Sequence, residues 1–240
     1  MDDSVPIVIV FIFIHLFSIY ISLPKLLLRR FISFSAGVGI AYVFIHMWPQ
    51  VAYYQRLAEE NIPWLIGSSL QHLLYLIALS GIVIIYAMDR LIARAYADEE
   101  ITNPNVLTSA LFKVNIVFFA LYNAMIGYLL AYESEVERSI VIYFIAFSLH
   151  FITNDWTLRR EHQSAYDRYG RWILSFSILG GYLLGSFANL PTFFIGGIEA
   201  FVAGAMTLNV IKHELPSERD GNLKGFLTGV ISAGFLFMFL

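Results

Sequence analysis

The sequence predicts an all-α, polytopic membrane protein with eight transmembrane helices and both termini on the non-cytoplasmic side. Of its 240 residues, 58% are hydrophobic and only 14% are charged, and the mean hydropathy is +0.69. A soluble domain carries about 25% charged residues. Apolar runs long enough to cross a bilayer recur along the whole chain, and basic residues gather in alternate connections between them. These three observations together predict the fold class.

Each predicted span meets the requirement of about 20 mostly apolar residues. The eight runs are 5 to 23, 31 to 48, 69 to 93, 107 to 132, 139 to 158, 172 to 188, 192 to 212 and 223 to 240. The N-terminal Met-Asp-Asp-Ser lacks the basic stretch of a signal peptide, so the first run is expected to be a true span.

The distribution of basic residues predicts the orientation. Of the 15 Lys and Arg residues, all but Arg56 and Arg138 follow odd-numbered spans or open the fourth, so they share one side of the membrane. The positive-inside rule places that side in the cytoplasm and both termini outside it. The semi-polar segment Pro49–Ser68 is then an outer loop, and its Tyr and Trp residues suit the membrane interface. Residues 1–240 are expected to form a single transmembrane domain.

Polar residues inside the fifth span are the main candidates for function. His150, Asn154 and Asp155 lie within the apolar run, where an ionisable group costs roughly 2.5–3.5 kcal/mol and usually faces a bundle interior or a water-filled path. At about 1.5 Å per residue, His150 lies roughly 16 Å from the outer end of its span, and Asn123 on the fourth span roughly 14 Å. We therefore expect Asn123, His150 and Asn154 to converge near the middle of the membrane.

Other polar residues are expected at other depths or in structural roles. Glu199 on the seventh span and His46 on the second lie nearer the outer surface, where they could draw cations in. His15 on the first span is interpreted as a core histidine bonded to a neighbour. Two short motifs, Glu161-His162 and Lys212-His213-Glu214, are interpreted as solvated helix ends.

Several stretches resemble the ZIP (Zrt/Irt-like) divalent metal transporters. The second span carries Ala36-Gly37-Val38 and His46-Met47-Trp48-Pro49, similar to that family's second helix. The seventh carries Phe201, Ala203-Gly204 and Leu215-Pro216, similar to its "F-x-AG … LPE" helix. The resemblance implies a ZIP-type bundle of eight helices, alternating access by one helix group moving against another, and transport of a divalent cation.

The metal motifs depart from that family. Where many members have "HNxxEG", residues 122–127 read YNAMIG, and where they have "HExPHE", residues 150–155 read HFITND. One carboxylate is sparse for a dication, although imidazole, amide and carboxylate donors suit zinc, iron or manganese. The candidate metal ligands are His150, Asp155, Asn123, Asn154, Tyr122, Glu199 and His46.

The expected function is transport of a zinc-, iron- or manganese-class cation toward the cytoplasm. The alternative is a non-transporting ZIP-like protein with a degenerate site and a structural or regulatory role. An enzyme is not expected, because the H-E-x-x-H motif of zinc hydrolases is absent. The expected partners are a divalent metal ion and the lipid bilayer of a plasma or inner membrane, with a homodimer left open. A net charge of −3 argues against nucleic acid. No tightly bound cofactor is expected, and the absence of cysteine rules out disulfides and thiolate ligands.

Overall fold

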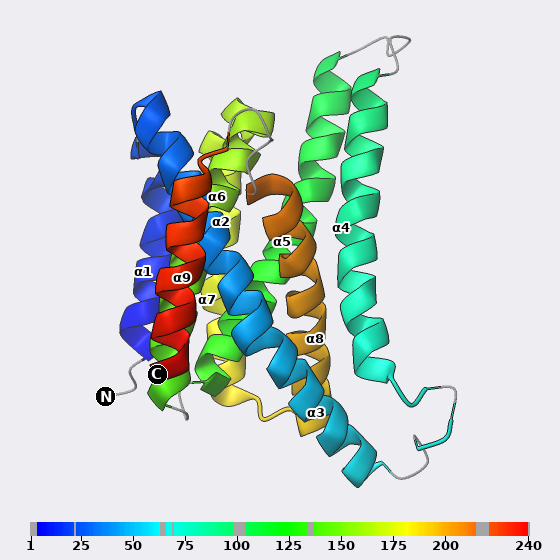
Figure 1. The fold of residues 1–240 in the computed structure, drawn as a ribbon. Helices are drawn as coiled ribbons and strands as arrows, with labels where there is room; N and C mark the ends of the chain where they lie inside the picture. Colours follow the sequence, from blue (N-terminus) through cyan, green and yellow to red (C-terminus); the bar gives the residue numbers. More distant parts are fainter. Residues whose placement is uncertain are drawn as a thin grey trace. The chain divides into compact units, whose positions relative to one another are not determined.

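The computed structural model describes residues 4–21, 23–62, 66–68, 70–97, 104–133, 137–214 and 221–239. All regular structure in these ranges is helical, which confirms the all-α prediction (Figure 1). The α-helices are α1 Ser4–Phe17, α2 Lys25–Tyr42, α3 Trp48–Asn61, α4 Leu73–Ala97, α5 Pro104–Glu133, α6 Glu137–Ala165, α7 Arg171–Phe187, α8 Thr192–Asn209 and α9 Leu223–Phe239. A 3₁₀ turn, Ser18–Tyr20, follows α1, and π-helical turns occupy Val43–Met47, Tyr166–Gly170 and Val210–Glu214.

The helices divide into two compact units. Unit 1 comprises residues 1–23 and 85–187, and therefore contains α1, the second half of α4, and α5, α6 and α7. Unit 2 comprises residues 24–84 and 188–240, with α2, α3, the first half of α4, α8 and α9. This division does not test the expectation of a single transmembrane domain over residues 1–240, which stays a prediction.

Unit 1 is held together by a glycine contact between α5 and α7 and by an aromatic core. A Cβ atom on Gly127 would strike the carbonyl oxygen of Ile178, and one on Gly181 would strike that of Ala124. Small residues allow helices to approach closely where lipid supplies no hydrophobic driving force. The core beside this contact contains Phe11, Phe147 and Phe151, which are fully buried.

Close contacts of this kind between a glycine and a neighbouring helix occur twice in unit 2. A Cβ on Gly37 of α2 would meet the carbonyl oxygen of Phe226 on α9, which lies along α2 in Figure 1. On α8, a Cβ on Gly204 would meet the carbonyl oxygen of Ala78 on α4. Gln55 of α3 fixes the start of α4, because its side chain donates to the carbonyl of Gln71 (2.6 Å) and accepts from the backbone N–H of Leu74 (3.1 Å). A helix start needs such partners for its unpaired N–H groups.

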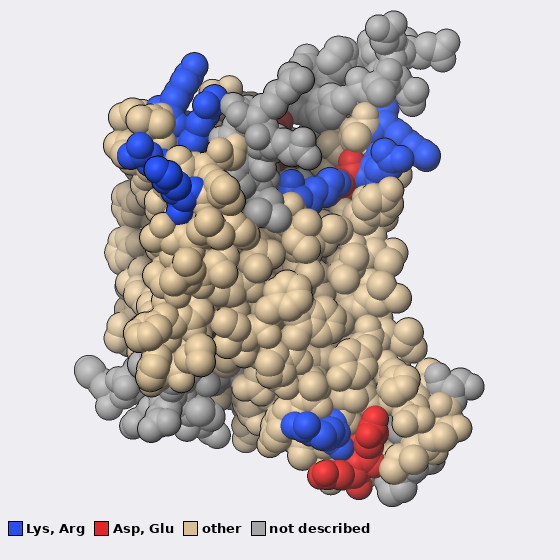
Figure 2. Space-filling view, viewed as in Figure 1, with Lys and Arg blue, Asp and Glu red and all other residues tan. Residues whose placement is uncertain are grey.

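Several of these helices are long and apolar enough to cross a membrane. In the described part of the chain five helical stretches qualify: Lys25–Asn61, Leu73–Arg94, Ala110–Tyr132, Ile140–Phe187 and Thr192–Lys212. Two shorter apolar helices cover Ser4–Tyr20 and Leu223–Phe239. Large apolar side chains are exposed on the helices, and on the face drawn in Figure 2 the described charged residues lie at helix ends. A membrane-embedded protein is therefore supported, while eight spans and outward termini stay predictions.

The predicted outer loop Pro49–Ser68 is wrong over most of its length, because residues up to Asn61 are helical. The chain passes from α2 into α3 through the π turn, and Pro49 occupies the first turn of α3. The helix is continuous over Lys25–Asn61, and the π turn just before Pro49, where the regular hydrogen bonding changes, accommodates a residue that lacks an N–H. Tyr54 is buried under Gly196 rather than lying at an interface, and Trp64 falls outside the described residues.

Candidate functional site

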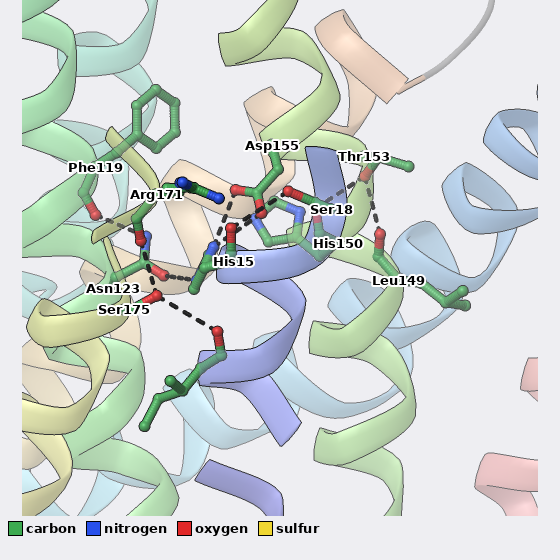
Figure 3. Close-up of polar contacts among 11 residues, drawn as sticks. His15, Ser18, Phe119, Asn123, Leu149, His150, Thr153, Asp155, Arg171 and Ser175 are labelled. Atoms are coloured by element: carbon green, nitrogen blue, oxygen red, sulfur yellow. Dashed lines mark hydrogen bonds and ion pairs between the residues drawn. The ribbon is translucent and has the colours of Figure 1, made fainter. Parts of the chain in front are cut away.

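The polar centre of unit 1 is a set of three side chains from three helices, which we call the Asp155 cluster: Asp155 of α6, His15 of α1 and Asn123 of α5. All three residues have 0% of their surface exposed. His15 Nδ1 lies 3.0 Å and 3.1 Å from the two carboxylate oxygens of Asp155, and His15 Nε2 lies 2.9 Å from Asn123 Oδ1 (Figure 3). One imidazole ring thus joins a carboxylate and an amide that are far apart in the sequence.

The hydrogen bonds fix the orientation of the Asn123 side chain. Its amide group donates to the carbonyl oxygen of Phe119 (2.7 Å), so its other atom, Oδ1, is the one that faces the ring of His15. Oxygen atoms of Asp155 and Asn123 therefore lie against the two ring nitrogens, one on each side of the imidazole. A buried carboxyl group requires hydrogen-bonding partners of this kind.

The end of α1 is tied to the helices that carry the rest of the cluster. Arg171 donates to the carbonyl of Leu16 (3.3 Å), and Arg159 donates to that of Ile19 (3.2 Å). Arg159 also forms a two-point ion pair with Asp167, with N–O distances of 2.8 Å and 3.2 Å. These cations satisfy the carbonyl groups that a helix leaves unpaired at its C-terminus. They consequently fix the backbone on the C-terminal side of His15.

The remaining candidates of unit 1 lie near the cluster but are not part of its hydrogen bonds. His150 is buried beside aromatic rings, with Tyr122 at 6.0 Å between ring centroids. Asn154 is buried too, and its side-chain amide nitrogen has no hydrogen-bonding partner among the described residues. The side chain of Asn123 forms hydrogen bonds with His15 and with the carbonyl of Phe119, whereas the sequence predicts that it lies against His150 and Asn154. The buried amide of Asn154 is a donor that a ligand, a water molecule or a rotated side chain could satisfy.

Two predicted site residues belong to unit 2. Glu199 of α8 is 4% exposed. His46 lies in the π turn after α2, where its ring stacks on Tyr42 at 5.1 Å between centroids. π-helical turns occur often at functional sites. The expectation that these two residues form an outer mouth stays a prediction.

The two motifs interpreted as solvated helix ends differ in the structure. His162 is buried, its Nε2 lies 3.0 Å from the amide nitrogen of Asn115, and its φ of −130° and ψ of 32° interrupt α6. The prediction of a solvated rim is therefore wrong for His162. In the other motif Lys212 is exposed, while the side chains of His213 and Glu214 lie outside the description.

His15 is the member of the cluster whose role the sequence did not reveal. It was expected to be a core histidine with a neighbouring partner, and the structure gives that partner as the one buried carboxylate of the site. The depth of His15 in its predicted span could have indicated that it lies near Asn123. His15 lies ten residues after the start of the first run, about 15 Å, close to the depth expected for Asn123 on the same scale.

The donor set defines what the site can hold. Within the described residues no group of three or more His, Cys, Asp or Glu side chains is placed to share a metal ion. Besides the carboxyl group of Asp155, the buried polar groups in this part of unit 1 are the imidazoles of His15 and His150 and the amides of Asn123 and Asn154. Comparison of the chain with protein-family models, with curated proteins and with solved structures finds no match.

Proposed function

We propose that this chain transports a divalent metal cation of the zinc, iron and manganese class across a membrane toward the cytoplasm, with the Asp155 cluster as its site. The observation that carries the proposal is Asp155 itself. Its carboxyl group is fully buried, and His15 of α1 contacts it and links it to Asn123 of α5. Ionisable groups within transmembrane segments usually face the bundle interior or a water-filled path, and they mark ion or substrate pathways.

The other ligands in this proposal come from the same unit. His150 and Asn154 both precede Asp155 on α6, His150 by just over one helical turn and Asn154 directly, and Tyr122 lies beside His150. The side-chain oxygens of Asn154 and Asn123 would add neutral ligands that tolerate burial. Glu199 and His46 attract the cation at the outer end in this scheme, as the ZIP resemblance implies.

Division of the chain into two compact units supports alternating access. In that mechanism one helix group moves against another, and each group must remain intact during the movement. The glycine contacts fall within the units, α5 on α7 in unit 1 and α2 on α9 and α4 on α8 in unit 2, so each unit has internal packing of its own.

A second candidate function is a non-transporting relative in which the cluster is structural. The observation that favours it is the mutual satisfaction of His15, Asp155 and Asn123, since a closed set of hydrogen bonds needs no ion. In this reading the hydrogen-bonded cluster fixes α1 against α5 and α6 and has no further role.

Metal uptake into reconstituted vesicles separates the two functions. Wild type, His150→Ala and Asp155→Asn are compared at equal protein content, with Ser177→Ala as the matched control. Ser177 belongs to the same unit, and among the described residues its hydroxyl bonds the carbonyl of Ile173 in its own helix. The transport proposal expects zinc uptake by wild type and the control and a loss of at least about tenfold in both site variants, which corresponds to about 1.4 kcal/mol. Equal uptake in all four would establish the structural role instead.

A further inference from the structure

We infer that the turn between α6 and α7 binds the headgroup of an anionic phospholipid through Arg160 and Arg168. The surface that takes the lipid, which we call the α6–α7 surface, consists of these two arginines and of Tyr169, Trp172 and Phe176. Such a lipid is a partner of unit 1 whether or not the chain transports a metal.

The α6–α7 surface carries positive charge that the protein itself does not neutralise. Residues 159–171 contain four arginines and only two acidic residues. One of the two, Asp167, is taken up by Arg159 in the two-point ion pair. Arg160 and Arg168 are exposed, and within the described residues neither forms a hydrogen bond or an ion pair. These two cations are therefore available to an anion from outside the chain.

The turn that presents the two arginines is fixed from its inner side. Tyr166 is fully buried, and a Cβ on Gly170 would lie 2.7 Å from its ring, closer than side chains pack. The ion pair between Arg159 and Asp167 joins the last turns of α6 to the same segment. Because Tyr166 occupies the interior, Arg168 two residues later is exposed. A surface held in this way needs little ordering when a ligand binds, which favours affinity.

Aromatic rings continue the surface from the turn along α7. The guanidinium carbon of Arg168 lies 5.1 Å from the ring centre of Tyr169. Trp172 is 45% exposed, and Phe176, one turn further, is 65% exposed and stacks on it with 6.4 Å between ring centroids. Tyrosine and tryptophan are enriched where a membrane meets water, whereas phenylalanine suits hydrocarbon. The order of cation, amphipathic ring and apolar ring matches a phospholipid from its phosphate to its acyl chain.

Two available arginines favour a headgroup with net negative charge. A guanidinium group binds phosphate oxygens with paired N–H donors. The headgroup of phosphatidylcholine carries a quaternary ammonium that offsets its phosphate, whereas that of phosphatidylglycerol has no cation. Each basic side chain near an anionic membrane surface contributes about fivefold in affinity. Arg160 and Arg168 together should therefore give a preference for phosphatidylglycerol of at least about tenfold.

Quenching of tryptophan fluorescence by brominated lipids tests this preference, because bromine quenches a tryptophan only at short range. The protein is reconstituted into phosphatidylcholine vesicles that contain a minor fraction of brominated phosphatidylglycerol or of brominated phosphatidylcholine. The chain has four tryptophans, so the difference between wild type and Trp172→Phe isolates the signal of Trp172. We expect brominated phosphatidylglycerol to associate at Trp172 at least about tenfold more strongly. Equal association of the two lipids overturns the inference.

Charge variants show whether the two arginines cause the preference. Arg160→Gln/Arg168→Gln should abolish it and leave quenching by brominated phosphatidylcholine unchanged. The matched control, Arg56→Gln/Lys224→Gln, removes two positive charges from exposed positions of unit 2 and should retain the preference. A preference that survives in Arg160→Gln/Arg168→Gln overturns the inference. A preference that the control loses to the same extent does so too, because the net charge of the protein would then account for it.

Two further measurements on the wild type separate a bound lipid from a soluble anion. Raising the salt concentration from about 0.1 M to about 1 M shortens the Debye length from about 10 Å to about 3 Å, so the preference should weaken. Inorganic phosphate at the same ionic strength should weaken it no more than chloride does, because only the lipid has an acyl chain to lay against Trp172 and Phe176. A preference that is independent of salt, or one that phosphate removes specifically, would overturn the assignment of the α6–α7 surface to an anionic lipid.

Discussion

The contact between α5 and α7 makes a prediction about two adjacent glycines. A Cβ on Gly181 would collide with the backbone of Ala124, whereas a Cβ on Gly180 would have nothing within 4 Å. The same substitution, Gly to Ala, therefore differs only in the direction that the new methyl group takes. We expect Gly181→Ala to destabilise unit 1 and Gly180→Ala to stabilise it.

The magnitudes follow from the contacts. Overpacking costs about 1–3 kcal/mol, and the upper end applies at Gly181 because the obstacle is a backbone carbonyl that has no alternative rotamer. Replacing a helical glycine with alanine in open space gains roughly 0.5–1 kcal/mol. The two variants should differ by about 3 kcal/mol, or roughly 6–12 °C in Tm for a chain of this length.

Tryptophan fluorescence during thermal unfolding in detergent measures this difference, with Gly127→Ala as a second variant. A Cβ on Gly127 would strike the carbonyl of Ile178, so its Tm should fall as that of Gly181→Ala does. Equal Tm values for Gly180→Ala and Gly181→Ala would refute the close approach of α5 and α7 and, with it, the packing that places Asn123 in the cluster.

Three further predictions concern topology, the core and the missing ligands. A cysteine at Arg168 should resist an impermeant reagent added from outside, and labelling there would reverse the orientation; the native chain has no cysteine to interfere. Phe151→Ala should cost about 3–5 kcal/mol in chemical unfolding, because the ring packs edge-on against Phe11 at 5.0 Å, and a loss below 1 kcal/mol would contradict that packing. The triple variant Ile126→Glu, Phe151→Glu and Asn154→His should bind zinc more tightly than wild type by calorimetry and melt at a lower temperature without zinc, because two added carboxylates suit the metal and repel each other. A folded triple variant with wild-type zinc affinity would contradict the correspondence of these positions with the ZIP motifs.

The sequence predicted the helical class because a long apolar run inside a membrane must satisfy its own backbone hydrogen bonds, and an α-helix does so. The sequence analysis misplaced helix ends where a helix continues beyond its apolar run. Pro49 was interpreted as the start of a loop, although the helix continues through it after the π turn Val43–Met47. Residues 159–165 are polar and were expected to form a connection, yet α6 extends to Ala165 with a kink at His162, and Arg159 binds Ile19 and Asp167.

The candidate site was predictable only in part. Asp155 and Asn123 stood out as polar residues inside apolar runs, and both are in the cluster. Local sequence pattern could not predict which side chains would pair, since His15 is separated from Asp155 by 140 positions and from Asn123 by 108. Periodicity gives depth and face within one helix, whereas the neighbour of a helix is set by packing, here through glycines on other helices.

The central claim is that a metal ion binds at Asp155, and anomalous X-ray scattering from crystals of the zinc-loaded protein tests it most directly. We expect a zinc peak about 2.0–2.2 Å from a carboxylate oxygen of Asp155, the usual zinc–oxygen distance, and its loss in Asp155→Asn. A zinc peak found only at other residues, or one that persists in Asp155→Asn, would contradict the claim.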